Sequence, residues 1–243
     1  MNLIIDIGNS NIKVALMENR LMHAFIRMET IELRRISQLF LEYTGINAGI
    51  VSSVNQDAGE VILKLDQGIK WLTLKDDTPL PFRNKYATPA TLGNDRIAVI
   101  AAAMHLFPVE NVLVIDAGSA ITYDLITSEG EYLGGAIAPG IRMRYKALHT
   151  FTGRLPLLDK IEEATPVGDT TATSIHSGVL NGALYEAEGF IRECQRHYNS
   201  LTIILTGGDY NYFDKQLKVK TFASPNLVLE GLNLILDHNL DKI

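Results

Sequence analysis

A short motif occurs twice in this chain, once in each half, and both copies lie between runs of apolar residues. The first copy is Ile5-Asp6-Ile7-Gly8-Asn9-Ser10, and the second is Ile115-Asp116-Ala117-Gly118-Ser119-Ala120. A buried strand that ends in a carboxylate, a glycine turn and a small hydroxyl residue brings backbone N–H groups and a hydroxyl to one point, which suits a phosphate or a hydrated cation. The repeat therefore predicts a duplicated domain that holds a nucleotide phosphate tail between its halves.

The length of the chain fits this duplication. Its 243 residues could form one large domain or two of about 110–130 residues, the usual domain size, and we expect halves at residues 1–108 and 109–243. Strand-like and helical segments alternate in both, which is typical of the α/β class. The expected strands are 3–6, 12–18, 21–27, 49–53, 112–115, 121–126, 132–137 and 202–205. The expected helices are 31–43, 57–65, 96–106, 141–149, 174–198 and 227–236.

The segment 75–89 breaks this alternation. It contains Pro79, Pro81 and Pro89 and has no hydrophobic periodicity, so we expect an ordered loop or the crossover between the halves. Loops of this length inside compact domains commonly serve a binding function.

Composition excludes several classes of protein. The net charge of −6 and the pI near 5.5 argue against a nucleic-acid-binding surface. A single cysteine, Cys194, excludes an intrachain disulfide and a cysteine-based zinc site. The six histidines are scattered, which makes a histidine metal cluster unexpected. The longest nearly apolar run, residues 97–107, is too short to span a bilayer and no signal peptide precedes Leu3, so we expect a cytoplasmic protein without a membrane segment.

The two repeated aspartates are the first candidates for chemistry. Asp6 and Asp116 lie at the carboxyl ends of expected buried strands, where open α/β sheets place their ligands. A carboxylate at such a turn could instead cap it through a hydrogen bond to the backbone. The repetition of the whole hairpin favours the functional interpretation. Lys13, in the first hairpin, could neutralise phosphate charge or could face solvent.

The second candidate is Gly93-Asn94-Asp95-Arg96, at the start of an alanine-rich helix. The pair of charges could cap the helix and form a surface ion pair. Alternatively, Asp95 could be a general base for an attacking hydroxyl, and Arg96 could bind a carboxylate or phosphate through two hydrogen bonds. The residues alone favour capping.

Two further glycine turns, Gly134–Gly140 and Thr206–Asp209, each end an expected strand. Glycine allows a ligand to approach the backbone closely, but it also serves any tight turn. Neither turn is a Walker A loop or a dinucleotide-binding fingerprint.

Taken in order, these motifs resemble the type III pantothenate kinases, which belong to the superfamily of sugar kinases, actin and heat-shock chaperones. The resemblance runs from Leu3 to about Leu232. It rests on the following segments: Asp6–Lys13, Gly93–Arg96, Asp116–Ser119, Gly134–Gly140, Gly168–Thr171 and Ser174–Gly178. Ser10 and Ser119 stand where the family usually has threonine, and Ala117 replaces a bulkier residue.

The resemblance implies an α/β fold of two duplicated ribonuclease-H-like (actin-like) domains, each a mixed five-stranded sheet flanked by helices. It implies ATP-dependent phosphorylation of pantothenate to 4'-phosphopantothenate, the first step of coenzyme A biosynthesis. It also implies Mg²⁺ with ATP, a monovalent cation (K⁺ or NH₄⁺), and a homodimer. A kinase of another small hydroxy acid and a non-catalytic ATP-binding regulator of the same fold remain alternatives.

The resemblance also assigns roles to residues. Asp95 would be the catalytic base. Asp6 would lie near Mg²⁺, and Asp116 would ligate the monovalent cation. The ATP-binding residues would be Asp6, Ile7, Gly8, Asn9, Ser10, Asn11, Ile12, Lys13 and Ser119. The pantothenate-binding residues would be Tyr86, Gly93, Asn94, Asp95, Arg96 and Thr171, with Thr171 supplied by the partner subunit.

Overall fold

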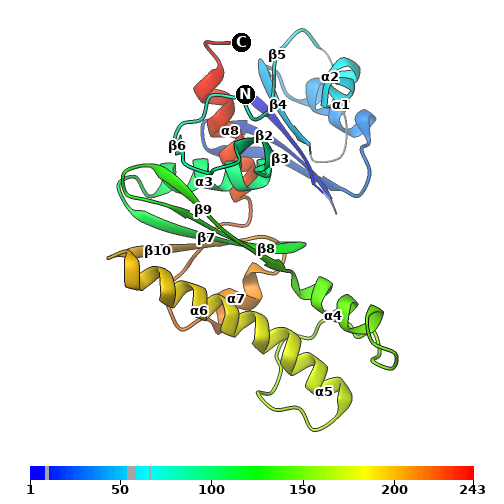
Figure 1. Cartoon of the computed structure of the whole chain (residues 1–243). Coiled ribbons are helices and arrows are strands. Elements are labelled where there is room, and N and C mark those ends of the chain that lie inside the picture. Colours follow the sequence, from blue (N-terminus) through cyan, green and yellow to red (C-terminus); the bar gives the residue numbers. More distant parts are fainter. Residues whose placement is uncertain (9–10, 54–57, 66) are drawn as a thin grey trace. The chain divides into compact units, whose positions relative to one another are not determined.

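The computed structural model describes residues 1–8, 11–53, 58–65 and 67–243, and these residues form two compact units. Unit 1 comprises Met1–Pro108, Gly130–Leu133 and Asn226–Ile243, and unit 2 comprises Val109–Glu129 and Gly134–Pro225. The C-terminal segment thus belongs to the same unit as the N-terminus. The expected halves, 1–108 and 109–243, describe a duplication of the sequence and stay a prediction. Figure 1 shows the elements of both units.

The sheet of unit 1 has the strand order β3-β2-β1-β4-β5. Its central strand β1 is buried along its whole length, because helices cover both faces of the sheet. The strands are β1 (Asn2–Ile7), β2 (Ile12–Glu18), β3 (Leu21–Met28), β4 (Ala48–Ser53) and β5 (Lys70–Thr73). The helices are α1 (Leu33–Glu42), α2 (Ala58–Leu65), α3 (Asn94–Leu106) and α8 (Leu227–Asn239), with a 3₁₀ turn η1 (Pro89–Thr91).

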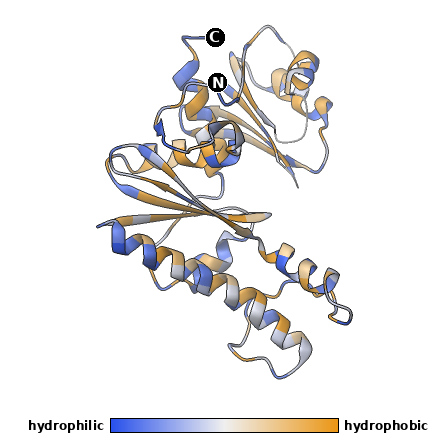
Figure 2. Cartoon of the chain, viewed as in Figure 1, coloured by the Kyte–Doolittle hydropathy of each residue, from blue (hydrophilic) through white to orange (hydrophobic). Residues whose placement is uncertain are grey.

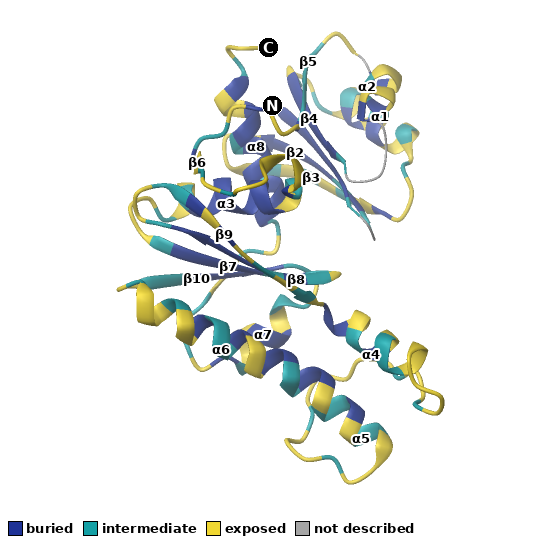
Figure 3. Cartoon of the chain, in the orientation of Figure 1, coloured by how far each residue is buried: buried dark blue, intermediate teal, exposed yellow. Residues whose placement is uncertain are grey.

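The two faces of this sheet bury different sets of apolar residues. Alternate residues of β1, such as Leu3 and Ile5, pack with Ile36 and Leu39 of α1. Helices α3 and α8 pack against each other, and α8 also contacts β1, β2 and β4. The middle of α3, Arg96–Ala103, is buried, as its dark colour in Figure 3 shows. The first turn of α3, which carries Asp95 and Arg96, is therefore held on a rigid core helix.

The sheet of unit 2 contains, in order, the strands β11-β10-β7-β8-β9. These strands are β7 (Asn111–Ala117), β8 (Ala120–Ile126), β9 (Glu131–Pro139), β10 (Leu201–Thr206) and β11 (Phe222–Ala223). The helices are α4 (Ile141–Thr150), α5 (Thr171–His176), a π-helical turn η2 (Ser177–Asn181), α6 (Gly182–His197) and α7 (Tyr210–Gln216). In Figure 2, α6 mixes hydrophilic and hydrophobic residues, as expected for a helix that covers a sheet with one side.

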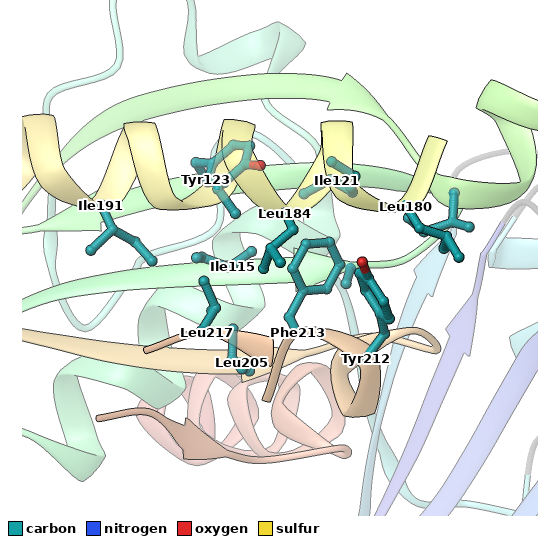
Figure 4. Packing of buried hydrophobic residues seen from close by; sticks show 14 of the residues in the cluster. Ile115, Ile121, Tyr123, Leu180, Leu184, Ile191, Leu205, Tyr212, Phe213 and Leu217 are labelled. Atoms are coloured by element: carbon teal, nitrogen blue, oxygen red, sulfur yellow. The ribbon is translucent and has the colours of Figure 1, made fainter. Parts of the chain in front are cut away.

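The core of unit 2 forms where α6 and α7 meet the sheet. Figure 4 shows Leu184 and Ile191 of α6 beside Ile115 of β7, with Phe213 of α7 against the same cluster. Cys194 packs at the edge of this core, and burial raises the pKa of its thiol. This agrees with the role of a small apolar residue.

The two sheets repeat one topology. The strand order β3-β2-β1-β4-β5 of the first sheet recurs as β9-β8-β7-β10-β11 in the second. In each sheet the central strand, β1 or β7, pairs antiparallel with the next strand of the chain and parallel with β4 or β10. Most expected elements are confirmed. The short elements β5, β6 (Arg83–Asn84), α7 and β11 were not expected. Segment 75–89 is mostly irregular as predicted, but β6 within it pairs with Glu131 and Tyr132 at the start of β9. None of the helices in the described ranges has the length and hydrophobicity needed to cross a membrane.

Candidate active site

The carboxylate of Asp6 lies at the centre of a small polar group in unit 1. In the sheet, Asp6 is paired with Lys13 on β2 and with Ser52 on β4, so the three side chains emerge on one face. Asp6 and Ser52 are buried, and the Ser52 hydroxyl donates a hydrogen bond to the Asp6 carboxylate. Ser52 was not predicted. It lies at a strand end without a motif, and only the pairing of β4 with β1 identifies it.

Asp6 is also close enough to Asp95 for the two charges to interact. Burial raises the pKa of Asp6 to about 6, the positive charge of Lys13 opposes this shift, and the negative charge of Asp95 adds to it. Two motifs far apart in the sequence, Asp6–Lys13 and Gly93–Arg96, thus converge in unit 1. A buried carboxylate whose charged form is disfavoured attracts a cation.

The other described residues of the first loop are of two kinds, those buried in the core and those hydrogen-bonded at the loop. Ile7 and Ile12 are buried among apolar side chains, so only their backbones are available to a ligand. The N–H of Gly8 donates to the carbonyl of Asn11 (3.1 Å) and closes the turn. The side-chain oxygen of Asn11 accepts from Arg27 (2.9 Å). The predicted ATP-binding residues Asn9 and Ser10 lie outside the described residues.

Asp95 is exposed in the first turn of α3. Its Oδ1 accepts from the N–H of Arg96 (2.8 Å), which satisfies one of the free donors at the helix start. A Cβ on Gly93 would lie 2.5 Å from the same oxygen, so a larger residue at this position would displace the Asp95 carboxylate. Asn94 donates from its side chain to the carbonyl of Leu74 (3.3 Å). Asp95 therefore satisfies one N–H of the first turn and also presents its carboxylate to solvent.

Arg96 is buried rather than on the surface, with only 5% of its area exposed. Its guanidinium carbon lies 5.4 Å from the centre of the Tyr86 ring, within the range of a cation–π contact. Tyr86 belongs to the proline-rich segment, and its N–H donates to the side-chain oxygen of Asn84 (2.9 Å). Unit 1 thus joins Asp6, Asp95, Arg96 and Tyr86 in one region.

In unit 2, Asp116 occupies the position equivalent to Asp6. Its neighbours in the sheet are Thr122 on β8 and Thr206 on β10. Gly207 has a φ of +89°, a backbone conformation that favours glycine. A Cβ at this position would also collide with the Asp116 carboxylate, so both the backbone conformation and the lack of space require glycine here. The turn Thr206–Asp209, whose sequence matches no specific motif, therefore lies directly beside Asp116.

A second contact joins this turn to the loop that follows Asp116. The N–H of Asp209 donates to the carbonyl of Ala117 (2.9 Å), and the Asp209 carboxylate pairs with Lys160 at 2.5 Å. Ser119, in the same loop, is exposed. The sequence patterns predict no role in the site for Thr206, Asp209 or Lys160.

The predicted substrate residue Thr171 is the first residue of α5, and it is exposed. The preceding residue, Thr170, forms a capping box with Thr173, which fixes the helix start. At the other end of α5, His176 shares a hydrogen bond of 2.8 Å with the Tyr145 hydroxyl. Thr171 therefore projects from a well-fixed helix end in unit 2.

Within the described parts of the chain, no group of three or more histidine, cysteine or acidic side chains could hold a metal by itself. The donors near Asp6 are instead one or two carboxylates and a hydroxyl. Mg²⁺ is commonly held by one or two carboxylates together with water and substrate phosphates. The residues present therefore fit a magnesium ion that arrives with a nucleotide.

Three comparisons with known proteins agree with one another. The family model described as type III pantothenate kinase matches residues 2–193. A type III pantothenate kinase from Christiangramia forsetii is 44% identical over 240 residues, which is 98% of this chain and 99% of that protein. A type III pantothenate kinase from Flavobacterium johnsoniae is 41% identical, and the match covers 100% of both chains.

Among solved structures, a conserved Baf family protein from Campylobacter jejuni matches with a TM-score of 0.66 at 24% identity, over 98% of this chain and 99% of that one. The activator of 2-hydroxyisocaproyl-CoA dehydratase from Clostridium difficile, solved with bound ADPNP, matches with a TM-score of 0.55 at 9% identity, over 99% and 96%. At these identities the structures show the fold alone. They agree with the duplicated ribonuclease-H-like architecture expected from the sequence.

Proposed function

The chain belongs to the type III pantothenate kinase family, and from this premise we propose which of its residues carry the reaction. As a member of this family it is an enzyme that phosphorylates pantothenate with ATP and a divalent metal, in coenzyme A biosynthesis. The observation that carries the residue assignment is the convergence of Asp6 and Asp95 in unit 1.

Asp95 is the catalytic base. Its carboxylate is exposed, it is fixed by the N–H of Arg96, and it lies at the end of a rigid helix. It accepts the proton of the terminal hydroxyl of pantothenate while the hydroxyl oxygen attacks the γ-phosphorus of ATP and ADP leaves. Phosphoryl transfer depends mainly on position and charge stabilisation, so a base that orients the hydroxyl is sufficient.

The acceptor site is formed by Tyr86, Gly93, Asn94 and Arg96. A guanidinium held at a fixed position by a ring and by burial is suited to a carboxylate, because it can donate two parallel hydrogen bonds. Pantothenate carries one carboxylate, at the end opposite its reacting hydroxyl. Arg96 therefore binds the acceptor by this group and orients it for Asp95.

The loop from Asp6 to Lys13 binds the phosphates of ATP, with the ammonium of Lys13 offsetting their charge. Asp6 would hold the magnesium ion, which supplies charge neutralisation at the phosphates when it is bound. In unit 2, Ser119 contacts ATP through its exposed hydroxyl.

Asp116 ligates a monovalent cation. Support comes from its position, since it repeats Asp6 in the fold while Thr122 and Thr206 replace Lys13 and Ser52 as its neighbours. Both of these neighbours carry hydroxyl oxygens, which are possible ligands for a monovalent cation. Replacing Asp116 by Ser should abolish the rate difference between K⁺ and Na⁺ buffers. An unchanged difference would exclude this site.

We assign the enzyme as a homodimer in which Thr171 reaches the acceptor site of the partner subunit. The exposure of Thr171 at the fixed start of α5 supports this assignment. Co-expression of Asp95→Asn and Thr171→Val chains tests it. In a mixed dimer one site would then combine an intact Asp95 with an intact Thr171, and activity should return. If Thr171 acts within its own chain, the mixture stays as inactive as the single variants.

The catalytic role of Asp95 is tested by Asp95→Asn, with Asp77→Asn as the matched control at an exposed loop position. The Asp95 variant should bind ATP normally and lose orders of magnitude in pantothenate turnover, whereas the control should keep its rate. Turnover of the Asp95 variant near the normal rate would exclude it as the base. If the unmodified enzyme turned over other hydroxy acids but not pantothenate, the assignment of pantothenate as the acceptor would be wrong.

A further inference from the structure

A second aromatic ring supports Tyr86 and Arg96, the two residues assigned to the acceptor. Tyr132, at the start of β9, belongs to unit 1 and is fully buried. Its ring stacks on Tyr86, with 6.1 Å between centroids and 22° between planes. Phe82 meets Tyr132 edge-on, with centroids 6.1 Å apart and planes at 74°. Arg96 lies over the Tyr86 ring. The contacts form one series, Phe82–Tyr132–Tyr86–Arg96, which we call the aromatic ladder.

Backbone hydrogen bonds fix the strand segments that carry the ladder. The N–H of Lys85 donates to the carbonyl of Tyr132 (2.9 Å), and the N–H of Arg83 donates to the carbonyl of Gly130 (2.9 Å). The side chain of Asn84 then accepts from the N–H of Tyr86. An otherwise irregular, proline-rich segment is thereby held in register with β9, so Tyr86 has little freedom to move.

We propose that Tyr132 is a positioning residue that determines the specificity of the acceptor site for a carboxylate. This inference rests on the proposed roles of Tyr86 and Arg96. Two donors must be aligned at once to bind a carboxylate through both oxygens, so the energy of this contact depends strongly on the orientation of the guanidinium. Tyr132 sets the position of the Tyr86 ring, and the Tyr86 ring sets the position of the guanidinium.

The aromatic ladder should affect the binding of the acceptor and not of ATP. It ends at Arg96, which is assigned to the acceptor, and none of its rings belongs to the loop assigned to the ATP phosphates. Loss of the Tyr132 ring leaves a void behind Tyr86, and a ring beside a void gains rotamer freedom. A less ordered Arg96 would still attract a negative charge but would discriminate less against an acceptor without one. The matching probe is pantothenyl alcohol, in which a hydroxymethyl group replaces the carboxylate.

The experiment compares Tyr132→Leu, Tyr132→Phe and Phe213→Leu, the last a fully buried ring of the unit 2 core. Tyr132→Leu should raise the KM for pantothenate about tenfold and leave the KM for ATP within about twofold. Its preference for pantothenate over pantothenyl alcohol, as a ratio of kcat/KM, should fall by a similar factor. Tyr132→Phe keeps the stacked ring and should keep the preference for pantothenate. Phe213→Leu should lower stability without changing the preference.

A second variant, Asn84→Ala, tests the inference if the Tyr132→Leu protein does not fold. Asn84 is only half-buried, and Asn84→Ala removes the side-chain acceptor of the Tyr86 N–H. It should raise the KM for pantothenate in the same direction. Equal changes in the KM of both substrates, or an unchanged preference ratio in every folded variant, would overturn the inference.

Tyr86→Leu separates this inference from the proposed function. If Tyr86→Leu leaves the KM for pantothenate unchanged, the acceptor site has been assigned wrongly. If Tyr86→Leu raises the KM and the Tyr132 and Asn84 variants do not, the acceptor site stands and only the role of the ladder is refuted.

Discussion

Replacing Asp6 by asparagine should stabilise the metal-free protein at neutral pH while it abolishes activity. Asparagine has the same shape, carries no charge and can still accept the hydrogen bond of Ser52. In the folded protein the pKa of Asp6 is raised from 3.8 to about 6, with burial as the largest cause. A carboxyl group with a raised pKa binds more protons in the folded state than in the unfolded state between these two pH values. The free energy of unfolding therefore falls as the pH rises through this window.

The magnitude follows from the shift. About two pKa units correspond to roughly 3 kcal/mol, which wild-type protein loses between about pH 4 and pH 7. The opposing effect of Lys13 is already contained in the shifted pKa. The variant does not titrate at this position. It should therefore be more stable than wild type by up to roughly 3 kcal/mol at pH 8 and of similar stability at pH 4.

Urea unfolding without Mg²⁺ or nucleotide measures this difference. Trp71, on β5, is the single tryptophan of the chain and lies in the same sheet as Asp6, so its fluorescence reports on unit 1. Asp77→Asn controls for the loss of one negative charge. A stability difference that is the same at pH 4 and pH 8, or an Asp6→Asn protein less stable than wild type at pH 8, would refute the reasoning.

Two further predictions concern helix α3 and its first turn. A Cβ on Gly231 of α8 would collide with the carbonyl of Ala98 on α3, so Gly231→Ala should separate the helices and cost about 1–3 kcal/mol, seen as a lower Tm together with slower turnover. Gly189→Ala on α6, where the nearest atom would be 4.0 Å away, should leave turnover unchanged. Arg96→Lys should raise the KM for pantothenate at least about tenfold at saturating ATP, because an ammonium lacks the planar pair of donors. An unchanged KM would remove Arg96 from the acceptor site.

Local patterns predicted the fold class and the motifs. The alternation of apolar strands with helices and the helix after Gly93 are visible in short stretches of sequence, and the structure confirms these elements. The Asp95 carboxylate accepts an N–H of the first turn of α3, while the N-cap position itself is Gly93 and has no side-chain hydrogen bond. Arg96, considered as a partner in a surface ion pair, is buried.

Elements without a periodic pattern could not be predicted. Strand β6 has two residues, Arg83 and Asn84, and exists because it pairs with the distant residues Glu131 and Tyr132. Strand β5 is four residues long and needs its parallel partner β4. Short strands of this kind receive their hydrogen bonds from other parts of the chain, so no local signal marks them.

By itself, the sequence determined the strands, turns and capped helix starts that hold Asp6, Asp95 and Asp116, because each depends on residues a few positions apart. Only the tertiary structure placed Ser52 beside Asp6, Thr206 beside Asp116 and Tyr132 behind Tyr86. These neighbours depend on the register between strands that are remote in the chain. That register is chosen by the burial of whole sheet faces against helices, which no local stretch of sequence contains.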